Sequence, residues 1–142
     1  MNRHTISGAM GGILIVYLLY GVAGLRWNFT PSMPTGLWRL THERPHRGSY
    51  VTVETLIKQV AGVPGDRITF SAEGVAINGK LWHQSAPAVP NHAPFNTIVL
   101  SKDQWLLMGD NPLSWDSRYT GWYPTTVIAN TAEPIWVKKA TK

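Results

Sequence analysis

The sequence predicts a mainly β protein, with one antiparallel β domain after a single N-terminal transmembrane helix. Residues 6–25 contain no charged residue, and a helix of that length rises roughly 30 Å, the hydrocarbon thickness of a bilayer. From residue 26 onward, short apolar–polar alternations are broken at close intervals by glycine, proline and asparagine, which is typical of short strands joined by turns. We therefore expect two parts: residues 1–26, a tip and membrane anchor, and residues 27–142, an all-β domain.

The composition excludes several classes of protein. Of the 142 residues, 44 % are hydrophobic and 15 % are charged, which fits a packed domain rather than a disordered chain. There is no cysteine, so disulfides, thiol nucleophiles and thiolate metal sites are ruled out. The net charge is +5, but the basic residues are scattered, which favours anionic lipid or plain solubility over a nucleic-acid partner.

Residues 6–25 have two other interpretations. A cleavable signal peptide has an apolar region of roughly 7–15 residues, and G-V-A at residues 21–23 resembles its cleavage site. A buried core helix normally has a polar face, which this run lacks. Because the run is long for a signal peptide, the sequence favours a retained anchor. Trp27, directly after Arg26, suits the aromatic belt at a membrane surface.

Turn signals separate the expected strands. Asn78-Gly79 between two apolar segments is a strong signal for a type I′ hairpin, and the proline-rich stretch from residue 85 to residue 95 indicates a surface loop. The expected strands are Leu37–Leu40, Tyr50–Glu54, Leu56–Ala61, Arg67–Ser71, Val75–Ile77, Lys80–His83, Thr97–Leu100, Trp105–Met108 and Ile135–Lys138.

A serine lies between two prolines soon after the apolar run. In N-F-T-P-S-M-P-T-G-L, residues 28–37, Ser32 has Pro31 before it and Pro34 two residues later. Prolines fix their own φ and disfavour helix at the preceding residue, so the segment is stiff. We interpret Ser32 as a nucleophile held at the membrane face. N-F-T at residues 28–30 also fits a glycosylation acceptor, a motif that is common by chance.

Lys58 is the candidate base. On a strand, Leu56, Lys58 and Val60 point to one face, so the lysine stands between two apolar side chains. It is either a lysine that snorkels from an edge strand or a desolvated lysine whose pKa is lowered by burial. A neutral lysine amine within hydrogen-bond reach activates a serine hydroxyl without histidine or aspartate.

A third polar stretch, M-G-D-N-P-L-S-W-D-S-R-Y, covers residues 108–119. Asp116 and Arg118 are two residues apart, so in an extended chain they share a face and can pair. The alternative is an exposed ion pair on a turn, which contributes little stability. Elsewhere, His83 and His92 lack a metal-ligand spacing, and we expect neither a metal nor a cofactor.

Together these stretches resemble the signal peptidase I superfamily of membrane-bound serine/lysine proteases. S-M-P-T-G-L at residues 32–37 is similar to the nucleophile motif, and R-G-S-Y-V-T-V at 47–53 to the strand motif that follows. L-I-K-Q-V-A-G-V-P-G-D-R at 56–67 is similar to the lysine motif, and residues 108–119 to the last motif. The resemblance covers residues 30–124, and it implies a signal-peptidase-like antiparallel β catalytic domain.

The spacing within the first motif indicates one branch. General signal peptidases have a variable residue between methionine and proline, whereas here Pro34 follows Met33 directly. This order resembles the conjugative-transfer peptidases of the TraF type, which mature a pilin subunit by a reaction that can end in cyclisation rather than hydrolysis. The chain departs from many signal peptidases in being one residue shorter between Asn111 and Asp116.

By this resemblance, Ser32 attacks the scissile carbonyl and Lys58 is the general base. The Ser32 backbone N–H and the Thr30 hydroxyl form the oxyanion hole. The supporting residues are Ser114, which orients the lysine amine, and the buttressing pair Asp116 and Arg118.

The resemblance implies a single-pass protein of the bacterial inner membrane with a cytoplasmic tip and a periplasmic catalytic domain. Its expected partners are membrane lipid and a precursor protein, either a pilin or a signal-peptide-bearing protein. The alternatives are a general signal peptidase and a catalytically idle, membrane-anchored β interaction module. A soluble self-cleaving repressor also uses a serine–lysine pair, but the apolar run and the lack of a DNA-binding segment oppose it.

Overall fold

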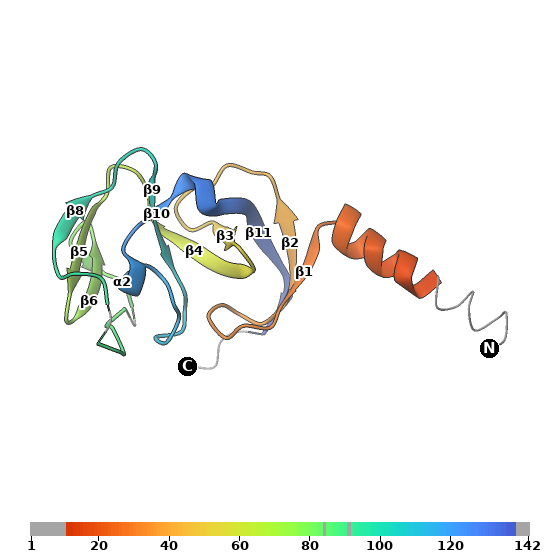
Figure 1. Cartoon of the computed structure of the whole chain (residues 1–142), viewed down its shortest axis with the longest axis horizontal. Coiled ribbons are helices and arrows are strands. Elements are labelled where there is room, and N and C mark those ends of the chain that lie inside the picture. The colour runs from red at the N-terminus through yellow and green to blue at the C-terminus, as the bar shows by residue number, and fades with distance from the viewer. Residues whose placement is uncertain (1–10, 84, 91, 139–142) are drawn as a thin grey trace.

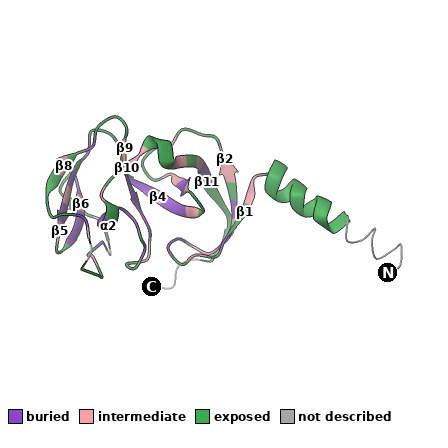
Figure 2. Cartoon of the chain, viewed as in Figure 1, coloured by how far each residue is buried: buried purple, intermediate pink, exposed green. Residues whose placement is uncertain are grey.

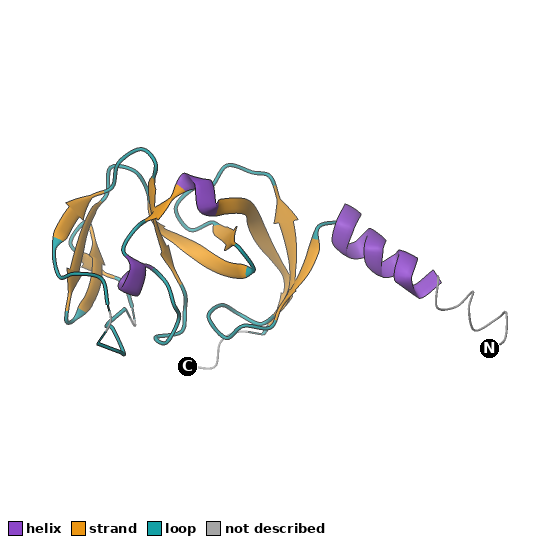
Figure 3. Cartoon of the chain, viewed as in Figure 1, coloured by secondary structure: helices purple, strands orange, loops and turns teal. Residues whose placement is uncertain are grey.

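The chain folds into two antiparallel sheets, and the computed structural model describes residues 11–83, 85–90 and 92–138. A seven-stranded sheet has the order β1-β2-β11-β3-β4-β9-β10, and a four-stranded sheet has the order β7-β6-β5-β8. The smaller sheet lies at one end of the domain, and the N-terminal helix projects from the other end beside β1 and β2 (Figure 1). The predicted mainly β, antiparallel fold is confirmed, and strands dominate the described chain (Figure 3).

The elements follow one another closely along the sequence. The strands are β1 (Leu25–Asn28), β2 (Gly36–Thr41), β3 (Tyr50–Val53), β4 (Leu56–Gly62), β5 (Arg67–Ser71), β6 (Gly74–Ile77), β7 (Lys80–Leu81), β8 (Thr97–Val99), β9 (Gln104–Met108), β10 (Tyr123–Pro124) and β11 (Ile128–Val137). The short helical segments are η1 (Leu18–Val22), α2 (Ser117–Thr120) and η2 (Thr125–Val127).

Most predicted strands occur within two residues of the expected bounds. Asn78 and Gly79 both have positive φ, 50° and 83°, as the predicted type I′ turn between β6 and β7 requires. The prediction for β11 was wrong in length, because only residues 135–138 were expected to be extended. Pro134 and the polar residues before it concealed this strand, which pairs with both β2 and β3 and has an irregular register between Pro134 and Trp136.

Strand β1 was not predicted, because its residues were divided between the apolar run and the segment after it. Leu25, the last residue of that run, begins β1 and pairs with Arg39 of β2. The expected boundary between residues 26 and 27 therefore falls inside this strand. Pairing with a neighbouring strand decides the conformation of these residues, and such a partner is not visible in a short stretch of sequence.

The N-terminal helix covers residues 11–22, of which Leu18–Val22 form a π-helical segment. Its side chains are exposed (Figure 2). Within the described chain, no helix combines the length and apolar character needed to cross a membrane. The first five residues of the predicted apolar run, 6–10, lie outside the described residues.

Strand β4 lies in the interior of the larger sheet and contributes to three apolar clusters. Its Ile57 packs with Met33 and Trp38 near the β1–β2 hairpin. Val60 belongs to a second cluster on β3, β4 and β9, and Ala61 to a third that joins the two sheets. A residue in the middle of β4, such as Lys58, is therefore surrounded by packed structure.

Replacement of Gly36 by alanine is expected to destabilise the hairpin. Gly36 has φ +139°, and a Cβ there would collide with the carbonyl oxygen of Trp136 and come within 2.8 Å of Val137 Cα. Positive φ alone costs a residue with a side chain roughly 1–2 kcal/mol. We expect Gly36→Ala to lower the free energy of unfolding by more than about 2 kcal/mol, measured by urea denaturation.

Gly48→Ala is the matched control. Gly48 also has positive φ (+88°), but no atom lies within 4 Å of the added Cβ. This variant should lose only the conformational term, roughly 1 kcal/mol. Equal losses in the two variants would show that the close approach to β11 has no energetic consequence.

Candidate active site

Ser32 lies in the connection of the β1–β2 hairpin. The two strands pair up to Asn28 and Gly36, and residues 29–35 between them form a loop, here called the Ser32 loop. Met33 inserts its side chain into the core, and the Ser32 carbonyl accepts a hydrogen bond from the Asp110 backbone N–H at 2.8 Å. Ser32 itself is largely buried, with 9 % of its surface exposed.

Asn28 binds the Ser32 loop from inside. Its Nδ2 donates to the carbonyl oxygens of Thr30, Met33 and Pro34 at 3.1, 3.2 and 3.1 Å. Its Oδ1 accepts from the Thr30 backbone N–H at 3.1 Å and from the Thr30 hydroxyl at 2.7 Å. The sequence offered Asn28 only as part of a motif and of a glycosylation acceptor, and this set of contacts was missed.

Lys58 is buried in the middle of the sheet. It pairs with Val51 of β3, and β9 lies on the other side of its strand. Lys58 is 2 % exposed, so the alternative of an edge lysine that snorkels to solvent is wrong. Its Nζ donates a hydrogen bond to Ser114 Oγ at 2.6 Å.

The environment of Lys58 favours its neutral form. Burial is the main cause that lowers the pKa of Lys58 below its ordinary value, and the positive charge of Arg118 lowers it further. The negative charge of Asp116 opposes both effects by raising the pKa. A lysine whose pKa is lowered in this way can accept a proton under conditions in which an exposed lysine cannot.

Gly109 brings the serine and lysine segments together. The chain leaves β9 at Met108, beside β4, and a Cβ at Gly109 would collide with Ser114 Oγ and come within 2.8 Å of the Ser32 carbonyl oxygen. Only glycine fits a point where both segments approach so closely. The loop of residues 109–116 therefore places the partner of Lys58 beside the Ser32 loop.

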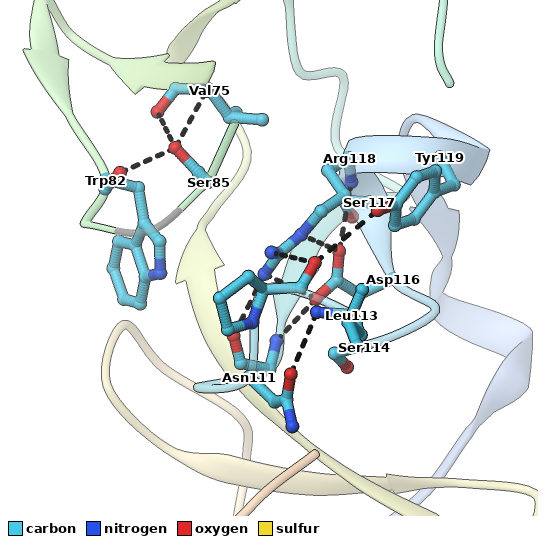
Figure 4. A network of polar contacts seen from close by, with 12 residues as sticks. Val75, Trp82, Ser85, Asn111, Leu113, Ser114, Asp116, Ser117, Arg118 and Tyr119 are labelled. Atoms are coloured by element: carbon cyan, nitrogen blue, oxygen red, sulfur yellow. Dashed lines mark hydrogen bonds and ion pairs between the residues drawn. The ribbon is translucent and has the colours of Figure 1, made fainter. Parts of the chain in front are cut away.

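A buried ion pair supports the loop of residues 109–116. Arg118 Nε donates to Asp116 Oδ1 at 2.8 Å, and the two side chains are 1 % and 0 % exposed. Arg118 also donates to the carbonyl oxygens of Gly109 and Pro112, at 3.1 and 2.8 Å. Asp116 Oδ2 accepts from the Gly109 N–H at 2.7 Å. Figure 4 shows Asp116 and Arg118 beside Ser114 and Asn111.

The predicted pairing of Asp116 and Arg118 occurs, but in a different local structure. An extended chain was expected, whereas Asp116 is the N-cap of α2 and accepts from the Arg118 backbone N–H at 3.1 Å. The alternative of a weak surface pair is wrong, because both residues are buried. Pairing within the first turn of a helix gives the same two-residue spacing as pairing along a strand, so spacing alone does not separate the two.

The six residues predicted for the site form three hydrogen-bonded pairs, of which the Asp116–Arg118 pair is described above. Thr30 Oγ1 and Ser32 Oγ are 3.1 Å apart in the second pair, and Lys58 and Ser114 form the third. Within the described residues, no direct Ser32–Lys58 hydrogen bond links the last two pairs. Catalytic hydrogen bonds are often long in unliganded proteins and tighten when substrate binds. The arrangement places the Ser32 and Thr30 hydroxyls in the β1–β2 connection and a buried lysine amine in the interior of the same sheet.

The structure also places Trp38 and two histidines that are close together in the sequence. Trp38 is fully buried in the core, with its Nε1 donating to the Pro34 carbonyl oxygen at 3.2 Å. The histidine spacing that binds metals on a helix does occur, as H-E-R-P-H at residues 42–46, but this segment is a loop in the structure. Among the described residues, no cluster of three or more His, Cys, Asp or Glu side chains is placed to hold a metal ion.

Residues 3–137 match the family of signal peptidases, peptidase S26, and the chain belongs to this family. A plasmid transfer protein TraF of Escherichia coli is 24 % identical over 171 aligned positions, which cover 95 % of this chain and 96 % of that protein. The predicted resemblance to the TraF-type branch is confirmed by this match over nearly the full length of both chains.

Two further relatives match part of the chain. A probable signal peptidase I-2 of Synechocystis is 35 % identical over 72 residues, which span half of this chain but only 33 % of that protein. A crystal structure of signal peptidase I from Enterococcus faecalis superposes with a TM-score of 0.46 at 18 % identity, over 64 % of this chain and 98 % of the other.

Loss of the Asp116 carboxylate is expected to destabilise the protein strongly. Asp116→Ala removes the carboxylate that pairs with the buried Arg118 guanidinium and removes the N-cap of α2. Breaking one partner of a buried pair costs about 3–5 kcal/mol, and we expect a loss of that size in urea unfolding. Asp103→Ala, at an exposed position before β9, is the control and should change stability by less than about 0.5 kcal/mol.

The buried lysine is expected to make stability depend on pH. The folded-state pKa of Lys58 is lowered, so between it and the higher unfolded-state pKa the unfolded chain binds more protons, and stability rises with pH across that window. Lys58→Met removes this dependence. The variant should be more stable than the wild type below the lowered pKa, and the difference should shrink as pH rises, measured by urea unfolding at several pH values.

Lys102→Met, at an exposed position before β9, is the control for this comparison. It should follow the wild-type pH profile throughout. A Lys58→Met profile that stays parallel to the wild type would contradict a lowered pKa for Lys58.

Proposed function

We propose that the protein is a membrane-anchored serine endopeptidase that uses a Ser32–Lys58 dyad to process exported precursor proteins, with a conjugative pilin as its substrate. Membership of the signal peptidase family supports a peptidase that acts on a protein substrate. The relation to plasmid transfer proteins TraF supports the conjugative role.

The observation that carries this proposal is the burial of Lys58 with its Nζ on Ser114 Oγ at 2.6 Å. An ammonium group inside a sheet is costly unless it loses its proton or finds a counter-charge. The hydrogen bond to the neutral Ser114 hydroxyl orients the Lys58 amine and adds no negative charge that would stabilise the protonated form. The adjacent Ser32 loop carries the hydroxyl from which such an amine takes a proton.

Acylation follows from these groups. Ser32 Oγ attacks the scissile carbonyl carbon while Lys58 Nζ accepts the hydroxyl proton, and the negative charge develops on the carbonyl oxygen. The Ser32 backbone N–H and the Thr30 hydroxyl stabilise that oxygen, each by roughly 3 kcal/mol. Lys58 then gives the proton to the departing amine as the C–N bond breaks, and an ester to Ser32 remains.

The ester is resolved by a second nucleophile. Lys58 takes a proton from water, which attacks the ester carbon. The C–O bond to Ser32 then breaks, Lys58 returns the proton to Ser32 Oγ, and a linear acid is released. If the amino group of the substrate's own N-terminus attacks instead, the product is a cyclic peptide. Cyclisation needs no additional group on the enzyme, because an amine and a water molecule occupy the same position relative to the ester.

The proposal includes an inner-membrane anchor and a periplasmic catalytic domain. The support is the uncharged run of residues 6–25 and the exposure of its large apolar side chains along the described helix, such as Ile13 and Tyr17. Exposed contiguous apolar surface of this kind marks contact with another phase or molecule. Ser32 lies ten residues after Val22, the end of that helix, so the chain between them reaches at most about 35 Å.

A general signal peptidase is the second candidate, favoured by the 35 % identity with a probable signal peptidase I-2 of Synechocystis over half the chain. The two functions differ in substrate rather than in chemistry. A catalytically idle interaction module is the remaining alternative. Cleavage of a pilin precursor, of a signal-peptide-bearing precursor, or of neither distinguishes the three.

Substitution of either dyad residue should abolish processing. We expect Ser32→Ala, Lys58→Ala and Lys58→Arg each to lower cleavage of a co-expressed conjugative pilin precursor by at least about 10⁴-fold. The arginine variant fails because guanidinium does not deprotonate. Mass spectrometry of the pilin measures the outcome, and a product that lacks one water relative to the cleaved linear chain identifies cyclisation.

Lys102→Arg is the matched control, since it makes the same exchange at an exposed lysine. Cleavage by the wild type should rise as pH increases through the lowered pKa of Lys58, and a chelator should leave it unchanged. Full activity of Lys58→Arg would refute the assignment of the base. Cleavage of a signal-peptide-bearing precursor but not of the pilin would select the second candidate.

A further inference from the structure

We propose that Asn28 is a positioning residue that holds the Ser32 loop in shape and sets the direction of the Thr30 hydroxyl. The proposal rests on the proposed serine peptidase function and adds to it a residue outside the dyad and the oxyanion hole. Asn28 ends β1, pairs with Gly36 and is 5 % exposed. Its side chain therefore lies inside the base of the loop rather than in solvent.

The amide nitrogen of Asn28 joins both arms of the loop. It contacts the carbonyl oxygens of Thr30, before Ser32, and of Met33 and Pro34, after it. Two N–H protons serve these three acceptors, so at least one proton is shared. The prolines in the loop have no N–H, so the backbone has fewer donors for these carbonyls. A side chain supplies the missing donors.

The amide oxygen of Asn28 controls the other hydroxyl of the site. It accepts from both the N–H and the hydroxyl of Thr30, the latter at 2.7 Å. A threonine hydroxyl has one proton, so Thr30 Oγ1 is then the acceptor in its 3.1 Å contact with Ser32 Oγ. In the resting protein, protons therefore point from Ser32 to Thr30 and from Thr30 to Asn28.

Catalysis requires this chain of hydrogen bonds to reorganise. Ser32 must direct its proton to Lys58, and Thr30 must turn its hydroxyl from the Asn28 oxygen to the developing oxyanion. The Thr30 backbone N–H still satisfies the Asn28 oxygen after that turn. Asn28 thus keeps the loop in one shape in the resting protein and during catalysis, while only the hydroxyl protons of Ser32 and Thr30 change direction.

The kinetic test uses the full chain in detergent and, as substrate, an internally quenched peptide with an Ala-X-Ala cleavage segment. The variants are Asn28→Ala, Asn28→Asp, Thr30→Val and the double variant Asn28→Ala/Thr30→Val. We expect Asn28→Ala to lower kcat by about 100-fold, with KM changed by less than about threefold. The double variant should be little worse than the worse single variant, because both changes affect one hydroxyl. Asn28→Asp keeps the acceptor but loses the donors, so kcat should fall at least about tenfold.

Hydrogen exchange of the Thr30 amide is a second readout that does not depend on activity. Removing the Asn28 side chain should make this amide exchange at least about tenfold faster. Asn96→Ala, an exposed asparagine before β8, is the control and should change neither exchange nor kcat. Exchange and kcat are measured for both Asn28→Ala and Asn28→Asp. If one variant does not fold, the other still tests the role of Asn28.

Different results overturn the two proposals. If Ser32→Ala cleaves the peptide as fast as the wild type, or if the wild type does not cleave it, the proposed function fails while the exchange measurement still tests the role of Asn28 in the loop. Unchanged Thr30 exchange, wild-type kcat in the Asn28 variants, or losses that multiply in the double variant would overturn the inference about Asn28.

Discussion

The amine of Lys58 is buried inside a β-sheet, and within the described residues no carboxylate forms an ion pair with it. This burial constrains the elements that pack around the lysine. Burial makes the charged form of Lys58 costly, so the surrounding protein must offer a neutral hydrogen-bond partner at a fixed place. Ser114 meets this need at 2.6 Å. Its position depends on the turn at Gly109, which has room for no side chain. The chemistry proposed for Ser32 therefore begins with the packing of β4 between β3 and β9.

The Asp116–Arg118 pair acts on Lys58 through its charges rather than through a hydrogen bond. The two residues affect the pKa of Lys58 in opposite directions, so a paired Asp116 does not act as a simple counter-ion for the lysine. The pair also satisfies the backbone of the loop, through Gly109 and Pro112. A buried pair is seldom a gain in stability over apolar residues, and its value here is the shape of the loop that carries Ser114.

Most of the strands, and the candidate residues of the site, could be predicted from the sequence. Ser32, Lys58 and the polar stretch of residues 108–119 are recognisable because each combines residue types with a spacing that ordinary loops lack. Strand β1 and most of β11 were not recognisable, because their conformation depends on partners that are distant along the chain. The role of Asn28 could not be predicted either. Its side chain binds backbone carbonyl oxygens, which every residue has, so no pattern of residue types indicates these contacts.

The fold class, the order of the motifs and the branch of the family can be predicted from the order of the residues, because these follow from local alternation, turn residues and the direct succession of Met33 and Pro34. Whether Lys58 is buried or snorkels to solvent could not be predicted in this way. Both outcomes suit an apolar–polar strand, and the difference lies in whether that strand is at an edge or in the interior of the sheet. Long-range pairing places β4 in the interior, and this placement removes water from the lysine amine.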